Sequence, residues 1–139
     1  MAVDITFRDD LRPDAGLIIE LYRAAPLYRP VDDAARIARM YAGSPMVLTA
    51  WEGTRLVGIL RGWTDGAYDG YVCDLAVHPD FQGRGVASEL LRLATATNSD
   101  VQWVLRASKA AQDYYEHLGW QRIANGWYWP RSPWQAADN

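Results

Sequence analysis

The chain has 139 residues, half of them hydrophobic, which predicts one core: a single domain over residues 1–134 with a disordered tail at 135–139. Lysine and arginine number 14 against 17 aspartates and glutamates, so the net charge of -3 argues against nucleic acid as a partner and suits cationic ones better. There is one cysteine and no leader-like or membrane-spanning apolar run, which predicts a cytoplasmic protein with no internal disulfide and no membrane partner.

The first 45 residues predict one strand and two helices. Residues 3–7 alternate apolar and polar side chains, as in a strand with one buried face. Residues 13–25 carry an amphipathic helical stripe that Pro26 ends. A second helix follows over residues 32–42, with Asp32 as its cap.

Three antiparallel strands are expected next. They cover Met46 to Trp51, Leu56 to Trp63 and Tyr71 to Val77, and turn signals separate them. The third strand is a nearly continuous apolar run, which indicates that it is largely buried. These three strands therefore position the loop that follows Val77 at the end of the sheet.

A glycine-rich loop follows that strand. Gln82-Gly83-Arg84-Gly85 leads into a helix whose apolar positions recur from Val86 at three-to-four-residue spacing. Two glycines before a helix let the backbone approach a ligand, and free N–H groups at a helix start bind phosphate. The lysine and hydroxyl of a Walker A loop are missing, as is the context of a dinucleotide fingerprint. A tight turn without a ligand remains the alternative.

The C-terminal third predicts a strand, a helix and a hairpin. Val101 to Ala107 is rich in β-branched and aromatic residues, and a helix begins near Ser108 and ends before Gly119. Asn125-Gly126 is a two-residue hairpin signal between strands at residues 120–124 and 127–129. The tryptophans in this hairpin suggest either a homodimer interface or a wall of a binding pocket.

Two motifs carry a family resemblance. Asp74-Leu75-Ala76-Val77, His78-Pro79 and Gln82-Gly83-Arg84-Gly85-Val86-Ala87 resemble motif A of the GNAT superfamily of N-acetyltransferases. Ala111-Gln112-Asp113-Tyr114-Tyr115-Glu116-His117-Leu118-Gly119-Trp120 is similar to the family's second signature, in the same order and separation. Residues 56–66 and 71–77, with Ser44 and Pro45, are also similar to a subgroup of small GNAT proteins that includes serotonin N-acetyltransferase-like enzymes.

The resemblance implies an α+β fold of the GNAT type. Its mixed, mostly antiparallel central sheet would have about 6–7 strands flanked by about 4 helices, splayed between the strands ending near Val77 and Ala107. Acetyl-CoA would lie in the splay with its pantetheine arm paired to backbone. The residues implied to bind it are Leu75, Ala76, Val77, Gln82, Gly83, Arg84, Gly85, Val86, Ala87, Ser88, Ser108 and Tyr115. Ser108 departs from the family's usual asparagine.

The implied reaction is direct attack of a primary amine on acetyl-CoA, with a small aromatic or alkyl amine favoured. Tyr115 matches the family's general acid, and Tyr114 beside it is expected to pack into the core. Asp74 either accepts the amine proton, directly or through water, or is a structural aspartate. The backbone N–H of Val77 is the candidate donor to the developing oxyanion.

The acceptor side is less specified. Leu27, Tyr28 and Tyr41 are the candidate substrate contacts, with ordinary helix packing as the alternative for each. No metal site is expected. Other functions left open are a non-catalytic acyl-CoA sensor, an acetyltransferase acting on a protein or peptide amine, and an aromatic-lined binder of carbohydrate or nucleobase.

Overall fold

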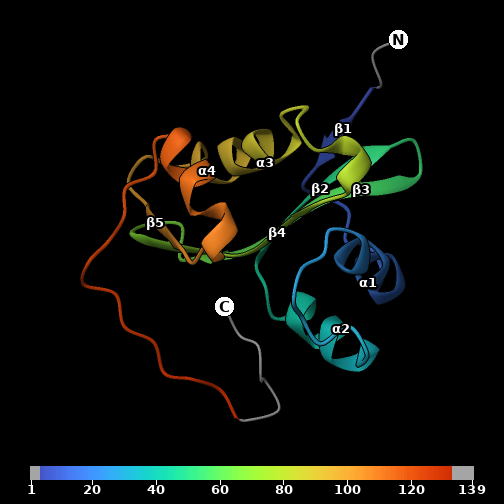
Figure 1. Ribbon diagram of the computed structural model, residues 1–139, viewed down its shortest axis with the longest axis horizontal. Helices are drawn as coiled ribbons and strands as arrows, with labels where there is room; N and C mark the ends of the chain where they lie inside the picture. The colour runs from blue at the N-terminus through green and yellow to red at the C-terminus, as the bar shows by residue number, and fades with distance from the viewer. Residues whose placement is uncertain (1–3, 133–139) are drawn as a thin grey trace. The chain divides into compact units, whose positions relative to one another are not determined.

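A computed structural model describes residues 4–132, and the chain divides into two compact units after Leu105 (Figure 1). The first unit holds five strands and three α-helices: β1 (Thr6–Arg8), α1 (Ala15–Ala24), α2 (Ala34–Ala42), β2 (Met46–Glu52), β3 (Arg55–Thr64), β4 (Asp69–Val77), α3 (Val86–Thr95) and β5 (Gln102–Leu105). A 3₁₀ turn, Pro79–Phe81, lies between β4 and α3.

The strands form one sheet in sequence order, β1-β2-β3-β4-β5. The first three pairings are antiparallel and the β4–β5 pairing is parallel, as α3 requires by crossing over between these two strands. The register shifts opposite Cys73, where Arg61 pairs with Asp74 and Gly62 pairs with Val72. The mixed, mostly antiparallel sheet is thus confirmed.

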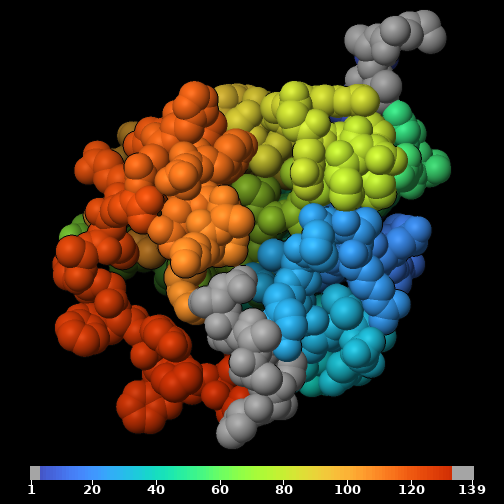
Figure 2. Space-filling view, in the orientation of Figure 1, coloured from blue at the N-terminus to red at the C-terminus, as the bar shows by residue number. Residues whose placement is uncertain are grey.

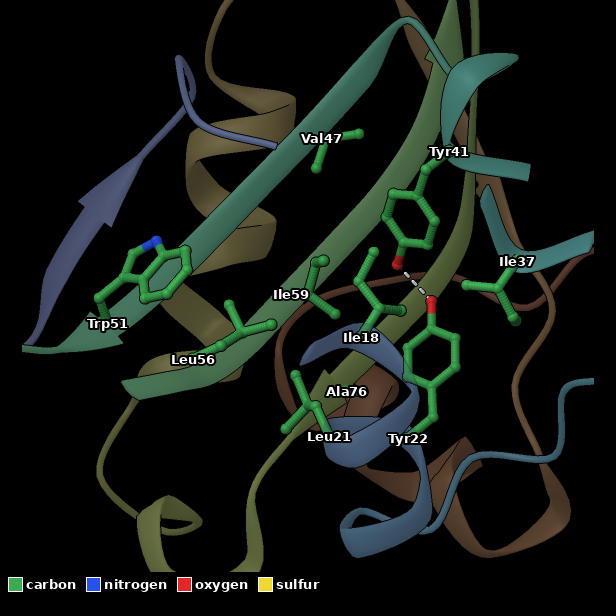
Figure 3. Packing of buried hydrophobic residues seen from close by; sticks show 10 residues of the cluster. All are labelled: Ile18, Leu21, Tyr22, Ile37, Tyr41, Val47, Trp51, Leu56, Ile59 and Ala76. Atoms are coloured by element: carbon green, nitrogen blue, oxygen red, sulfur yellow. Dashed lines mark hydrogen bonds between the residues drawn. The ribbon is translucent and has the colours of Figure 1, made fainter. Parts of the chain in front are cut away.

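Helices α1 and α2 cover one face of this sheet and α3 covers the other (Figure 1). Side chains of α1 and α2, including Ile18, Leu21 and Ile37, pack on Ile59 and Ala76 of the sheet (Figure 3). Asp14, expected within the first turn of α1, is instead its N-cap, and α2 is capped by Asp33, one residue later than the sequence suggested. Asp32 and Asp33 are both suitable caps, and the one whose side chain accepts a backbone hydrogen bond is known only from the structure. The sequence pattern therefore places the start of a helix only to within a residue.

On the opposite face, α3 lies against Gly58 of β3. A β-carbon at Gly58 would meet Val86 Cγ1 at 2.9 Å, Ala50 Cβ at 3.2 Å and Leu90 Cδ1 at 3.3 Å. The missing side chain therefore lets the first turns of α3 pack directly on the sheet.

The second unit contains a 3₁₀ turn (Lys109–Ala111) and the helix α4 (Gln112–His117). Gly119 follows α4 with φ +95°, as expected of a residue just past a helix end. The predicted hairpin at residues 120–129 is wrong: this run holds no strand, and Trp127 and Trp129 are 96% and 95% exposed. This run is coloured orange to red in Figure 2.

The strand count is therefore five in the described residues rather than 6–7. An Asn-Gly turn brings two segments together, but an isolated two-stranded hairpin is only marginally stable without a neighbouring strand or helix. The expected strand at 101–107 is shorter and ends at Leu105. No helix within residues 4–132 has the length and apolar character needed to cross a membrane. The expected tail at 135–139 lies outside the described residues.

Candidate active site

The open edge of β4 is the first element of the site. β4 pairs with β5 only from Asp69 to Val72. On this same edge, Cys73–Val77 have no strand partner within residues 4–105. The N–H of His78 donates to Val57 O at 2.8 Å, so the backbone groups of His78 point toward β3. The backbone N–H and C=O groups of successive residues in a strand point alternately toward its two neighbouring edges. The peptide groups of Leu75 and Val77 therefore point away from β3. An open edge stands where the sequence predicted a splay.

The loop after β4 is tied to the end of that strand. Gln82 Nε2 donates to the carbonyl of Val77 at 3.1 Å. Gly83 and Gly85 have φ of +76° and +79°, values that other residues adopt only with strain. Gly85 is the N-cap of α3 and supplies no side-chain cap, so the first N–H groups of α3 keep their capacity for an anion.

Ser88 and Arg84 also contribute to the structure of this loop. The Oγ of Ser88 donates to Gly85 O at 3.1 Å, which stabilises the first turn of α3. The guanidinium of Arg84 stacks on the Phe81 ring at 5.2 Å, and that of Arg55 lies 5.3 Å from the same ring. Val86 is buried and Ala87 partly buried, as residues facing the sheet should be. The loop thus combines exposed glycines with a guanidinium that lies over the Phe81 ring.

Asp74 is the centre of a buried charge network on the α1–α2 face. Its side chain is inaccessible to solvent. Oδ1 accepts from Arg29 Nε at 2.7 Å, with Arg29 Nη2 at 2.6 Å. Oδ2 accepts from Arg61 Nε at 2.8 Å and from the Tyr22 hydroxyl at 2.6 Å. The Tyr22 and Tyr41 hydroxyls are also hydrogen-bonded to each other (Figure 3).

These contacts shift the pKa values of the groups. Burial alone would raise the pKa of Asp74, but the hydrogen bond from Arg61 and the charges of both arginines outweigh it and lower the pKa. Burial and the nearby Asp74 charge raise the pKa of Tyr22 and of Tyr41. The network at neutral pH therefore consists of one carboxylate, two guanidiniums and two neutral phenols.

The three candidate acceptor contacts differ in their surroundings. Tyr41 belongs to the buried cluster, with 5% of its surface exposed. Leu27 is half-buried against that cluster, whereas Tyr28 is 46% exposed. Packing accounts for Tyr41, so only Leu27 and Tyr28 of this set offer surface to a ligand. Their contact with an acceptor stays a prediction.

The second unit contains Ser108 and Tyr115. Ser108 precedes the 3₁₀ turn and makes no side-chain cap, and Tyr115 lies on α4 with its ring against Trp120. Burial, then the neighbouring Tyr114, raise the pKa of Tyr115 to about 12. The expectation that Tyr114 packs into the core is wrong, because 39% of its surface is exposed.

Arg29 and Arg61 were not anticipated as site residues. Arg61 interrupts the apolar run of β3, and Asp74 interrupts that of β4. Since the two strands were predicted to be antiparallel neighbours, opposite charges inside both runs were a signal for a cross-strand pair. Arg29 comes from the loop between α1 and α2, and no local pattern indicates its contact.

The comparisons with known proteins decide the family. Residues 44–122 match a family described as an acetyltransferase (GNAT) domain. The chain belongs to the GNAT acetyltransferase family. A Pectobacterium atrosepticum acetyltransferase is 37% identical over 87 residues, which cover 61% of this chain and 59% of that one. An uncharacterized N-acetyltransferase of Gracilaria tenuistipitata var. liui is 28% identical over 81 residues, covering 52% and 44%. The GNAT chain thus spans about half the length of these curated relatives.

Solved structures share the GNAT fold. A probable acetyltransferase from Staphylococcus aureus superposes with a TM-score of 0.77 at 18% identity, covering 93% of this chain and all of that one. An aminoglycoside acetyltransferase from an uncultured soil metagenomic sample, solved in complex with sisomicin, gives a TM-score of 0.65 at 17% identity, covering 92% and 97%. At such identities the likeness concerns the fold alone.

Proposed function

We propose that this protein transfers an acetyl group from acetyl-CoA to a primary amine by direct attack. The observation that carries the proposal is the continuity of the open β4 edge with the glycine loop at the start of α3, in a chain of the GNAT family. An extended ligand with two amides and a diphosphate needs both features side by side.

Acetyl-CoA would be held mainly by main chain. The outward peptide groups of Leu75 suit the pantetheine amides, because they point away from β3 and lack a strand partner within residues 4–105. The carbonyl of Val77 is bound by Gln82, which leaves its outward N–H for the thioester end of the ligand. The diphosphate would bind the N–H groups of the loop and of the first turn of α3, with Arg84 as a cation beside them. The residues present therefore fit this donor.

Three groups of the protein have roles in the proposed reaction. The Val77 N–H would stabilise the oxyanion that forms on the thioester carbonyl. Tyr115 would protonate the departing thiolate, and its raised pKa keeps that proton on the hydroxyl at neutral pH. Asp74 has a lowered pKa and both oxygens engaged, so this geometry favours its structural role over proton acceptance, and the amine proton then passes to water.

The acceptor we favour is a small aromatic or alkyl amine rather than a protein or peptide amine. Exposed Tyr28 and half-buried Leu27 on the α1–α2 loop give an apolar surface of modest size.

The test is release of free CoA from acetyl-CoA in the presence of arylalkylamines, alkylamines, polyamines, aminoglycosides and peptides. Calorimetry with acetyl-CoA accompanies the assay. Affinity for acetyl-CoA with CoA release dependent on a small amine is the expected result. Affinity without release for any amine would favour the acyl-CoA sensor instead, and release only with peptides would identify a protein-directed enzyme.

A further inference from the structure

The Asp74 network carries more positive than negative charge. Arg29 and Arg61 share the single carboxylate, and both tyrosines are neutral. A third guanidinium lies close by: Arg12 donates to the carbonyl oxygen of Ser44 at 2.7 Å, and the Ser44 hydroxyl lies 3.2 Å from Arg61 Nη1. The Asp74 network together with Arg12 therefore carries a net positive charge in a protein whose net charge is -3.

The excess charge lies where the open edge of β4 begins. Arg29 Nη2 donates to the carbonyl of Cys73 at 3.0 Å. Cys73 is the first residue of β4 after its pairing with β5 ends at Val72. Arg29 itself comes from the α1–α2 loop that also carries Leu27 and Tyr28. Its guanidinium thus joins the proposed acceptor surface to the strand proposed to hold the thioester.

Both arginines retain donors for a ligand. A guanidinium has five N–H groups in a planar fork. Arg29 uses Nε and Nη2 on Asp74 and Cys73 and one Nη1 hydrogen on Tyr28 O, and its side chain is 25% exposed. Arg61 binds Asp74 through Nε and Ser44 through Nη1, which leaves Nη2 without a partner in the described part of the chain, and its side chain is 16% exposed.

We propose that the amine acceptor also carries an anionic group, a carboxylate or a phosphate, which binds at Arg29 and Arg61 and so orients the amine beside β4. This rests on the proposed function and narrows its substrate class. A second positive charge on the acceptor would be repelled by the two guanidiniums, whereas an anion gains charge-assisted hydrogen bonds. Such bonds are typically worth about a ten- to hundred-fold change in affinity.

The experiment compares acceptors that differ by one anionic group. The pairs are tryptamine with tryptophan, tyramine with tyrosine, and ethanolamine with phosphoethanolamine, each assayed for CoA release by the full chain. We expect kcat/KM to be about ten- to hundred-fold higher for the acidic member of at least one pair, mostly through KM. The pair with the larger ratio distinguishes carboxylate from phosphate.

Variants then locate the preference. Arg29→Gln should bring the ratio close to one, and Arg29→Lys should keep part of it because the charge remains while the fork is lost. Arg23→Gln is the matched control, since Arg23 binds Asp32 and Val31 O at the same loop but does not contact Asp74. Melting temperature and acetyl-CoA affinity are measured for each variant.

Two results would overturn the inference. One is an equal or higher kcat/KM for the neutral member of every pair in the unmodified protein, which needs no variant to fold. The other is an acidic preference that survives Arg29→Gln. In both cases acetyl transfer itself would stand. Failure to bind acetyl-CoA in calorimetry would instead remove the proposed function, and the acceptor inference with it.

Discussion

Replacing Asp74 with asparagine tests the charge network most directly. The substitution keeps the shape and one acceptor oxygen, but it removes the charge and turns a second acceptor into a donor. That donor would face Arg61 Nε, which now lies 2.8 Å from Oδ2 and cannot accept a hydrogen bond. Two guanidiniums would then be left partly buried without a counter-ion.

The expected cost is large because Asp74 is 2% exposed and its arginine partners are mostly covered. Breaking a buried ion pair from one side typically costs about 3–5 kcal/mol. For a chain of this size, that corresponds to a fall in melting temperature of about 10–20 °C. Asp10→Asn is the control, because Asp10 also pairs with an arginine but on the surface, and it should leave the melting temperature nearly unchanged.

The pH dependence supplies a second readout. The folded pKa of Asp74 is lowered from 3.8, so its contribution to stability is present above that value and is lost as pH falls through the folded pKa. The gap in unfolding free energy between the unmodified protein and Asp74→Asn should therefore be full at pH 7 and shrink below about pH 4. Unfolding in urea at several pH values measures it.

A gap under about 1 kcal/mol at pH 7, or one that does not change with pH, would refute this account of the network. Turnover of the surviving folded fraction separates the two roles of Asp74. If the carboxylate were the catalytic base, Asp74→Asn would lower kcat strongly at every pH. The apparent pKa values of the other groups in the pH–rate profile would stay unchanged.

Three further substitutions test the loop, the acid and the packing. Tyr115→Phe should lower turnover, toward the low end of the roughly 10²- to 10⁴-fold typical of a general acid, with melting temperature little changed; Tyr114→Phe is its control, and full turnover in Tyr115→Phe would discard the assignment. Gly85→Asp should abolish acetyl-CoA binding in calorimetry, whereas Gly53→Asp, which takes similar backbone strain at φ +59° outside the loop, should not. Gly58→Ala should cost about 1–3 kcal/mol in thermal unfolding, because its β-carbon would collide with α3; no loss would contradict that packing.

The sequence predicted elements whose patterns are local. The structure has the strands β2, β3 and β4 and the helix α3 where apolar runs or amphipathic patterns predicted them. A buried strand or an amphipathic helix requires a regular spacing of apolar residues within one short segment, so the segment alone reveals it. The glycines of the loop were found for the same reason: positive φ values at positions 83 and 85 demand glycine.

What the sequence missed depends on contacts between distant segments. The hairpin around Asn125-Gly126 had the correct turn residues, yet strand formation also needs a neighbouring strand, which no local signal supplies. Tyr114 is exposed and Tyr115 partly buried, and this difference depends on contacts beyond α4, such as that of Tyr115 with Trp120, which no local pattern indicates. Arg29 lies 45 residues from Asp74 along the chain, so its role became visible only from the fold.

The bulge at Cys73 offers a physical reason why the open edge begins there. An extra residue in one strand bends it and increases its twist, and bulges recur beside active sites. In β4 the register shift against β3, the end of pairing with β5 and the carbonyl bound by Arg29 all fall at residues 72–74. The register shift thus falls where the pairing with β5 ends, opposite Leu105, and Arg29 satisfies the first carbonyl beyond that pairing. Asp74, next in the chain, holds Arg29 there, so the charge network and the opening of the edge are parts of one local structure.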